Sequence, residues 1–129
     1  MTIEAQHDGI SQSEGLKIDS EHFNELEAVI EVAEEARIIL VHNLHVAYGL
    51  MNGTQGTIKR VVYKPDGHTN HDNPDLRFPE CILVDFPEYE GPAFFNEPEK
   101  RTWCPIFPRE ISDPESIDVK RRQFPLVLG

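Results

Sequence analysis

Histidines and aspartates in one short stretch have the spacing that most suggests metal chemistry. His68 and His71 lie three positions apart among Asp66, Asp72 and Asp75. Imidazole nitrogens and carboxylate oxygens are common ligands of zinc. The prolines, glycine and asparagines around them are typical of a solvated loop, and a stable site needs rigid elements to hold its ligands. We therefore interpret the stretch as a polar loop and assign it no metal.

A second pair of histidines and the two cysteines give no stronger pattern. His42 and His45 are also three positions apart, and we expect them to pack beside a turn at the end of a strand. Cys81 and Cys104 are flanked by apolar residues and neither belongs to a CxxC motif. Two small buried thiols are favoured, with a disulfide or a metal site as the alternatives. The sequence predicts no metal ligand.

The sequence contains no recognisable catalytic constellation. A phosphate-binding loop ends in Gly-Lys, and no Gly-Lys dipeptide occurs in the chain. A Gly-x-Ser-x-Gly elbow is also absent, and the pair Glu34-Glu35 is expected on an exposed segment. We predict no catalytic residue and no cofactor.

Two clusters of cations could contact nucleic acid. Lys59 and Arg60 lie on one predicted strand, and Lys120, Arg121 and Arg122 on the last. If these strands are neighbours, five cations form one positive face for single-stranded DNA. The alternative is solvated charges that discourage edge-to-edge strand pairing. The net charge of −11 opposes DNA binding, although residues 1–54 carry −8 of it and residues 55–129 only −3.

Short strands separated by turn-rich loops must position these residues. In the central segment, Asn52-Gly53 is a strong turn signal between two strands, and Gly56 offers another unusual backbone position. The pattern predicts a mainly β fold, a small antiparallel barrel of about five strands. The expected strands are residues 37–42, 57–63, 80–86, 102–107 and 119–127.

The N-terminal third is more ambiguous. Residues 1–25 contain few large apolar side chains and many acidic or polar ones, which predicts a flexible acidic arm. Residues 20–37 could form a short helix capped by Ser20. The β-branched cluster at residues 28–32 favours a strand followed by a tight turn. Glu35 would occupy a turn position where glycine is usual, so the turn geometry is a point to test.

Motifs along the chain carry a resemblance to a known family. The segment GLMNGTQGTI, from Gly49 to Ile58, follows an apolar strand and Asn43-Leu44. Further motifs recur in the same order: LVDF at 83–86, Tyr89, Gly91-Pro92, Pro105-Ile106 and RRQFPL at 121–126. Together they resemble the C-terminal half of Pif-one/RecD-like ATP-dependent DNA helicases, which contain a GLxNGxxGxV segment. The resemblance runs from about Leu26 to the last residue.

This resemblance implies an SH3-like β-barrel over residues 26–129, inserted in the second RecA-like motor domain of a helicase. It also implies single-stranded DNA and other helicase segments as partners, ATP and Mg²⁺ as requirements of the full-length family, and a nuclear location. In the family, the Gln-Phe-Pro-Leu segment leads into a TIHKSQG-type motif. This chain stops at Leu128-Gly129, so we interpret it as a noncatalytic helicase fragment.

Two alternatives remain open at this point. The chain could be a free-standing SH3-like adaptor, or a subunit that complements a separate ATPase polypeptide. In the adaptor hypothesis a peptide groove is formed by five aromatic residues: Tyr48, Tyr63, Tyr89, Phe94 and Trp103. No apolar run is long enough to span a membrane and no signal peptide is apparent, so we expect an intracellular protein without a membrane partner.

Overall fold

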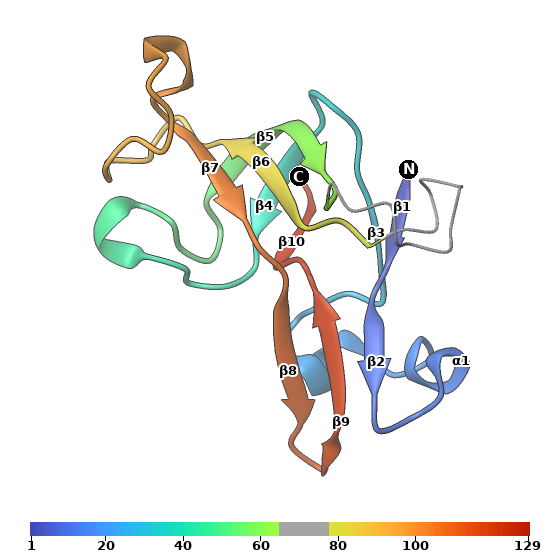
Figure 1. The fold of residues 1–129 in the computed structure, drawn as a ribbon. Helices are drawn as coiled ribbons and strands as arrows, with labels where there is room; N and C mark the ends of the chain where they lie inside the picture. Colours follow the sequence, from blue (N-terminus) through green and yellow to red (C-terminus); the bar gives the residue numbers. More distant parts are fainter. Residues whose placement is uncertain (65–77) are drawn as a thin grey trace.

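The computed structural model describes residues 1–64 and 78–129, and this part of the chain is mainly β (Figure 1). The stretch with His68, His71 and three aspartates lies outside the described residues. The strands are β1 Thr2–Glu4, β2 Gln6–Asp8, β3 Val29–Glu31, β4 Arg37–Leu40, β5 Gln55–Val62, β6 Cys81–Asp85, β7 Trp103–Ile106, β8 Arg109–Asp113, β9 Ser116–Gln123 and β10 Leu126–Leu128. The short helices are α1 Gln12–Gly15, η1 Ser20–Phe23, η2 Val46–Tyr48 and η4 Pro98–Lys100.

The largest sheet has five antiparallel strands in the order β10-β4-β5-β6-β7. Alternate side chains of its strands point into the core, which is the two-residue period of a half-buried sheet. In β6 and just beyond it, Ile82, Val84 and Phe86 are buried as their spacing predicts. Phe124, after β9, is also fully buried and extends this core.

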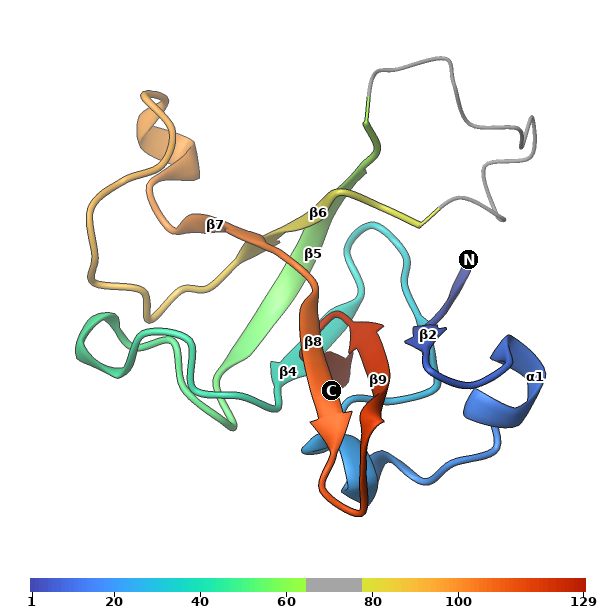
Figure 2. The same cartoon turned by 60° about the horizontal axis from the view of Figure 1, so that its bottom comes forward.

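A second sheet has three strands in the order β2-β9-β8, and β1 and β3 form a separate pair. The β8–β9 hairpin connects β7 to β10, and it extends away from the five-stranded sheet toward β2 and α1 (Figures 1 and 2). Strand β8 was not predicted. The predicted strand at 119–127 is divided into β9 and β10 at Phe124-Pro125, and Pro125 has no N–H to donate to a ladder.

The mainly β prediction is confirmed, and the closed barrel of about five strands is not seen. Strands β10 and β7 are the two edges of the five-stranded sheet, and among the described residues no ladder joins them. The chain leaves this sheet after β7 to build the β8–β9 hairpin before it returns as β10. The sheet therefore stays open.

The N-terminal residues are folded, which corrects the prediction of a flexible acidic arm over residues 1–25. Strand β1 pairs with β3 and β2 pairs with β9. Ile3, Ala5 and Phe23 are buried, and the Ala5 N–H donates to the carbonyl of Ala28 at 2.7 Å. The polar composition did not indicate these contacts, because few apolar residues anchor the segment. Arg121 supplies a polar anchor in addition.

Two turns between strands require unusual backbone angles. Glu35 has φ +68°, so a non-glycine residue occupies the left-handed region between β3 and β4. Its N–H donates to the carbonyl of Ile58 at 2.7 Å, which fixes the turn against β5. Gly49, at the end of η2, has φ +88°, and a Cβ there would lie 2.8 Å from the carbonyl oxygen of Glu88.

Asn52 and Gly53 occupy the middle of a turn that leads into β5. The Thr54 N–H donates to the carbonyl of Met51 at 2.9 Å, and Gly53 has φ +99°. Gly56 lies within β5 opposite Ile38, where a Cβ would lie 2.9 Å from the carbonyl oxygen of Asp85. Gly53 thus meets a conformational requirement, whereas Gly56 meets a requirement for space.

We predict that Gly53→Val lowers the free energy of unfolding by about 1–3 kcal/mol, because a β-branched residue is strained at positive φ. No atom lies within 4 Å of the Cβ position at Gly53, so a clash does not contribute. Urea denaturation monitored by circular dichroism measures the change. Gly53→Asn is the matched control and should cost less, because asparagine tolerates the left-handed region. An unchanged midpoint for Gly53→Val would contradict the prediction.

Candidate nucleic-acid interface

The five cations predicted to form one positive face lie on two different sheets. Lys59 and Arg60 are on β5 of the five-stranded sheet, whereas Lys120, Arg121 and Arg122 are on β9 of the three-stranded sheet. The condition for one positive face, that β5 and β9 are neighbours, is therefore not met. The two strands are apart because the β8–β9 hairpin leaves the larger sheet and forms a sheet with β2.

Arg121 is fully buried, with 0% of the residue exposed. Nη1 donates to the carbonyl of Leu26 at 2.8 Å, and Nη2 donates to the carbonyls of Gly15 at 2.9 Å and Ile18 at 2.7 Å. The guanidinium carbon lies 4.4 Å from the centroid of the Phe23 ring. Arg121 therefore cannot contact a nucleic acid in this conformation, and its assignment as a contact residue is corrected to a structural one.

A histidine completes the contacts of Arg121. Nε of Arg121 donates to Nε2 of His7 at 2.9 Å. Burial lowers the pKa of the Arg121 guanidinium, and the negative charges of Glu27 and Asp19 oppose that shift. The side chain thus joins β9 to four points of the N-terminal segment without a direct ion pair among the described contacts.

The neighbours of Arg121 on β9 are accessible but separate. Arg122 is exposed, donates to Oε1 of Gln6 at 3.1 Å and lies 5.2 Å from the ring of Phe78. Lys120 is half-buried and lies 4.0 Å from a carboxylate oxygen of Glu110. These two cations remain available to a ligand.

A second group of cations surrounds the only tryptophan. Nζ of Lys100 lies 5.0 Å from the centroid of the Trp103 ring and 5.8 Å from that of Phe95, and Nζ of Lys59 lies 5.9 Å from the Trp103 ring. Phe95 packs edge-on against Trp103 at 6.1 Å. We call Lys59, Phe95, Lys100 and Trp103 the Trp103 surface. Lys100 was not among the predicted residues, although its place three residues before Trp103 in a basic-aromatic stretch is a sequence signal.

The Trp103 surface belongs to the five-stranded sheet and its adjoining turn. Lys59 is on β5, Trp103 is the first residue of the edge strand β7, and Lys100 ends η4. Lys59 also forms an ion pair with Glu35 at 3.1 Å. A short distance along the chain, the Arg101 guanidinium lies 5.8 Å from the ring of Tyr89. Cations and aromatic rings thus gather over the part of the sheet between the central strand β5 and the edge strand β7.

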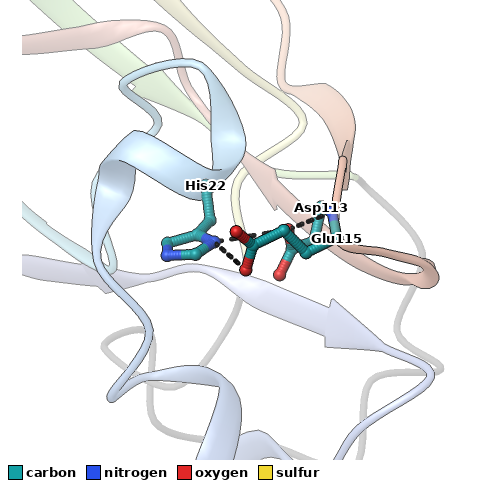
Figure 3. Close-up of side chains that lie close together, drawn as sticks. All are labelled: His22, Asp113 and Glu115. Carbon is teal, nitrogen blue, oxygen red and sulfur yellow. Dashed lines mark hydrogen bonds and ion pairs between the residues drawn. The ribbon is translucent and has the colours of Figure 1, made fainter.

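His22 on η1 forms a cluster with Asp113 and Glu115, which lie at the turn between β8 and β9 (Figure 3). Nδ1 of His22 lies 3.3 Å from Oδ1 of Asp113 and 3.9 Å from Oε2 of Glu115. The Glu115 N–H bond and the contact with His22 lower the pKa of Asp113. These atoms could hold a divalent cation, but the Glu115 side chain is 80% exposed and Asp113 is already bonded. We assign the cluster to tethering η1 to the β8–β9 turn.

Two of the histidines singled out in the sequence, His42 and His45, and both cysteines occupy structural positions in the described part of the chain. His42 is buried, with Nε2 bonded to the carbonyl of Asn24 and Nδ1 lying 3.3 Å from Nη1 of Arg109. His45 stacks on Tyr48 at a centroid distance of 3.9 Å. Cys81 and Cys104 are free and buried, as expected. Burial raises the pKa of Cys104 to about 12, so this thiol is not a nucleophile at neutral pH.

The five aromatic residues of the adaptor hypothesis do not share one groove. Tyr48, Tyr89 and Phe94 form a cluster, with ring centroids 6.2 Å and 5.8 Å apart along the series. Trp103 packs with Phe95 instead, and the Tyr63 hydroxyl lies 3.4 Å from the sulfur of Met1. The structure therefore does not assemble the predicted peptide groove.

Comparisons with known proteins place this fold. No family model matches the sequence, and no curated protein is detectably similar to it. Solved structures do match. A Pif1 helicase from Candida albicans has a TM-score of 0.55 and 19% identity, over 99% of this chain and 28% of that one. Bacteroides Pif1 bound to single-stranded DNA has a TM-score of 0.53 and 14% identity, over 100% of this chain and 24% of that one.

The chain has the fold of a segment of Pif1 helicases. A structure of two coordinating Pif1 helicases at forked double-stranded DNA also matches, with a TM-score of 0.54, 16% identity and 100% of this chain covered. The chain spans only 22–32% of the length of these Pif1 chains. The match to Pif1 includes the N-terminal residues for which the sequence motifs offered no counterpart.

We predict that Arg121→Met lowers the free energy of unfolding by about 3–5 kcal/mol, because several buried acceptors lose their donor at once. The matched control is Arg122→Met, one position along β9 on the exposed side, which should change stability by about 0.5 kcal/mol or less. Urea denaturation of both variants provides the comparison. Equal midpoints for the two proteins would show that the buried network contributes nothing.

Proposed function

We propose that the chain is a noncatalytic helicase-type module that contacts single-stranded DNA weakly and works together with helicase segments outside this chain. Its similarity to Pif1 structures over its whole length supports this proposal, together with the small share of those chains that it covers. The Bacteroides protein is bound to single-stranded DNA, and another matching structure concerns unwinding of forked DNA.

The observation that carries the proposed DNA contact is the placement of two lysine ammonium groups beside the Trp103 ring, at 5.0 and 5.9 Å. Proteins that bind single strands without sequence preference combine cations for the phosphates with aromatic rings on which bases stack. The lysines stand beside a ring that is half-buried in the free protein. In the proposed complex they bind phosphates while a base packs on the indole.

The charge of the protein limits the affinity of this contact. The net charge of −11 repels DNA at long range, and Glu35 already pairs with Lys59. Two or three cations neutralise few phosphates, so binding is weak and independent of sequence. A module of this kind adds affinity to a larger assembly through effective concentration, in which the proposed helicase segments supply the main DNA contacts.

The two alternative functions are an adaptor and a subunit of a separate ATPase. The adaptor hypothesis loses its five-residue groove, although exposed Phe94 and Phe107 line an open pocket of about 350 Å³. A subunit that complements a separate ATPase polypeptide would also lack a Gly-Lys phosphate-binding loop of its own.

Among the described residues no helix is long and apolar enough to cross a membrane. A nuclear location remains a prediction from the resemblance.

We predict that a labelled oligothymidine strand binds the chain with a dissociation constant above about 10 µM at low salt and quenches the fluorescence of Trp103. Because the chain has a single tryptophan, quenching reports on this surface alone. The logarithm of affinity should fall by about 0.7 per contacted phosphate against the logarithm of salt.

The test uses two variants with the same charge change. Lys59→Gln/Lys100→Gln should weaken binding at least several-fold, whereas Lys120→Gln/Arg122→Gln on the three-stranded sheet should bind like the wild type. Equal loss in both variants would indicate general electrostatic attraction. Absence of binding by the wild-type protein at low salt would overturn the proposed DNA contact.

We predict that the purified chain hydrolyses no ATP, with or without single-stranded DNA, because its sequence lacks a phosphate-binding loop. A coupled ADP-release assay measures turnover. Activity that survives a second purification and increases with single-stranded DNA would contradict the noncatalytic assignment.

A further inference from the structure

The contact between His7 and Arg121 joins the N-terminal segment to β9 at the edge of the buried Arg121 site. His7 on β2 lies opposite Arg121 on β9 in the strand register. Nε2 of His7 accepts the hydrogen bond from Nε of Arg121 at 2.9 Å. An imidazole nitrogen can accept only when it carries no proton. The bond therefore requires neutral His7.

The other ring nitrogen fixes the tautomer. Nδ1 of His7 lies 2.9 Å from Oε1 of Gln12, so it donates its proton to that amide oxygen. The Gln12 amide nitrogen donates in turn to the carbonyl of Ala5 at 2.5 Å. The ring packs closely on the backbone of Gly15, where a Cβ would lie 2.4 Å from its Cγ. The imidazole is thus clamped between α1 and β9.

Protonation of His7 breaks this arrangement. A proton on Nε2 would face the Nε–H of Arg121, which removes the acceptor and places two positive charges in contact. Burial lowers the pKa of His7 below 6.5, the Arg121 charge lowers it further, and the Gln12 bond opposes the shift. The charged groups near the contact are Asp19 and Glu27, on the η1 side, and their negative charges raise the pKa of Arg121. Gln12 and Phe23, from α1 and η1, are neutral.

We propose that His7 and Arg121 form a pH-sensitive clasp that holds residues 7–26 against β9 at neutral pH and releases them on acidification. The guanidinium bonds the carbonyls of Gly15, Ile18 and Leu26, so these points are held through the same side chain. Opening the clasp separates β2 from β9 and leaves the five-stranded sheet, which β2 does not join, intact.

The pH interval follows from linkage. The unfolded or released segment has His7 at its ordinary pKa of 6.5, above the value in the closed clasp. Fewer protons are bound in the closed state, so its stability is complete above about pH 6.5 and decreases as the pH falls toward the lower pKa. Asp113, whose pKa is lowered from 3.8, acts at more acidic pH and is separable from this effect.

Hydrogen exchange of the full chain tests the clasp. After correction for intrinsic rates, protection of amides in β2 and of Ala5 should be constant from pH 7.5 to about 6.5 and should then fall, by up to about tenfold at pH 5.5 for one proton. Amides of β5 and β6 should keep their protection. His7→Gln retains an acceptor for Arg121 without a titrating group, so its N-terminal protection should not depend on pH over this interval.

His45→Gln is the matched control, because His45 is exposed and stacks only on Tyr48 in the described contacts. It should show the same pH dependence as the wild type. Protection of β2 that is unchanged between pH 7.5 and 5.5 would overturn the clasp. So would a His7→Gln variant that keeps the wild-type dependence, since another group would then be responsible.

Discussion

The burial of the Arg121 guanidinium is the constraint on which the arrangement of the two smaller sheets depends. Removing a cation from water costs several kcal/mol unless its donors are satisfied. Here the acceptors are three backbone carbonyls and a neutral imidazole, all within residues 7–26. The N-terminal segment must therefore fold against β9 whenever Arg121 is buried. Since that segment buries few apolar side chains of its own, this polar network is a main part of what attaches it to β9.

The same burial changes where the protein can meet a ligand. Because side chains alternate along β9, Arg121 points inward while Arg122 is exposed, and the run of three cations is interrupted. The hairpin that carries them leaves the larger sheet, whose edge strand β7 then carries Trp103 between the lysines of β5 and η4. The open sheet thus separates a structural basic cluster from an accessible cation-aromatic surface.

Local patterns were sufficient for most strands of the five-stranded sheet. The apolar alternation around Ile82, Val84 and Phe86 predicts both the strand and the face it buries, and the structure confirms both. The backbone demand at Gly53 is also local, since its positive φ selects glycine, whereas glycine at position 56 is required by the close approach of the Asp85 carbonyl oxygen on β6. Glu35 shows the limit of such arguments, because a bond to β5 holds a non-glycine residue at positive φ. Residue propensities alone cannot predict that hydrogen bond.

The sequence by itself determined the mainly β class, most strands of the larger sheet and the motifs that resemble the helicase family, because these depend on residues close together in the chain. Only the tertiary structure decided that the sheet stays open, that residues 1–25 fold, and that Arg121 is buried while Lys100 adjoins Trp103. The physical reason is that burial of a charge depends on acceptors about 100 residues away, such as the carbonyls of Gly15 and Leu26. The sequence of a strand does not show whether a lysine or arginine in it is solvated or hydrogen-bonded to a buried carbonyl.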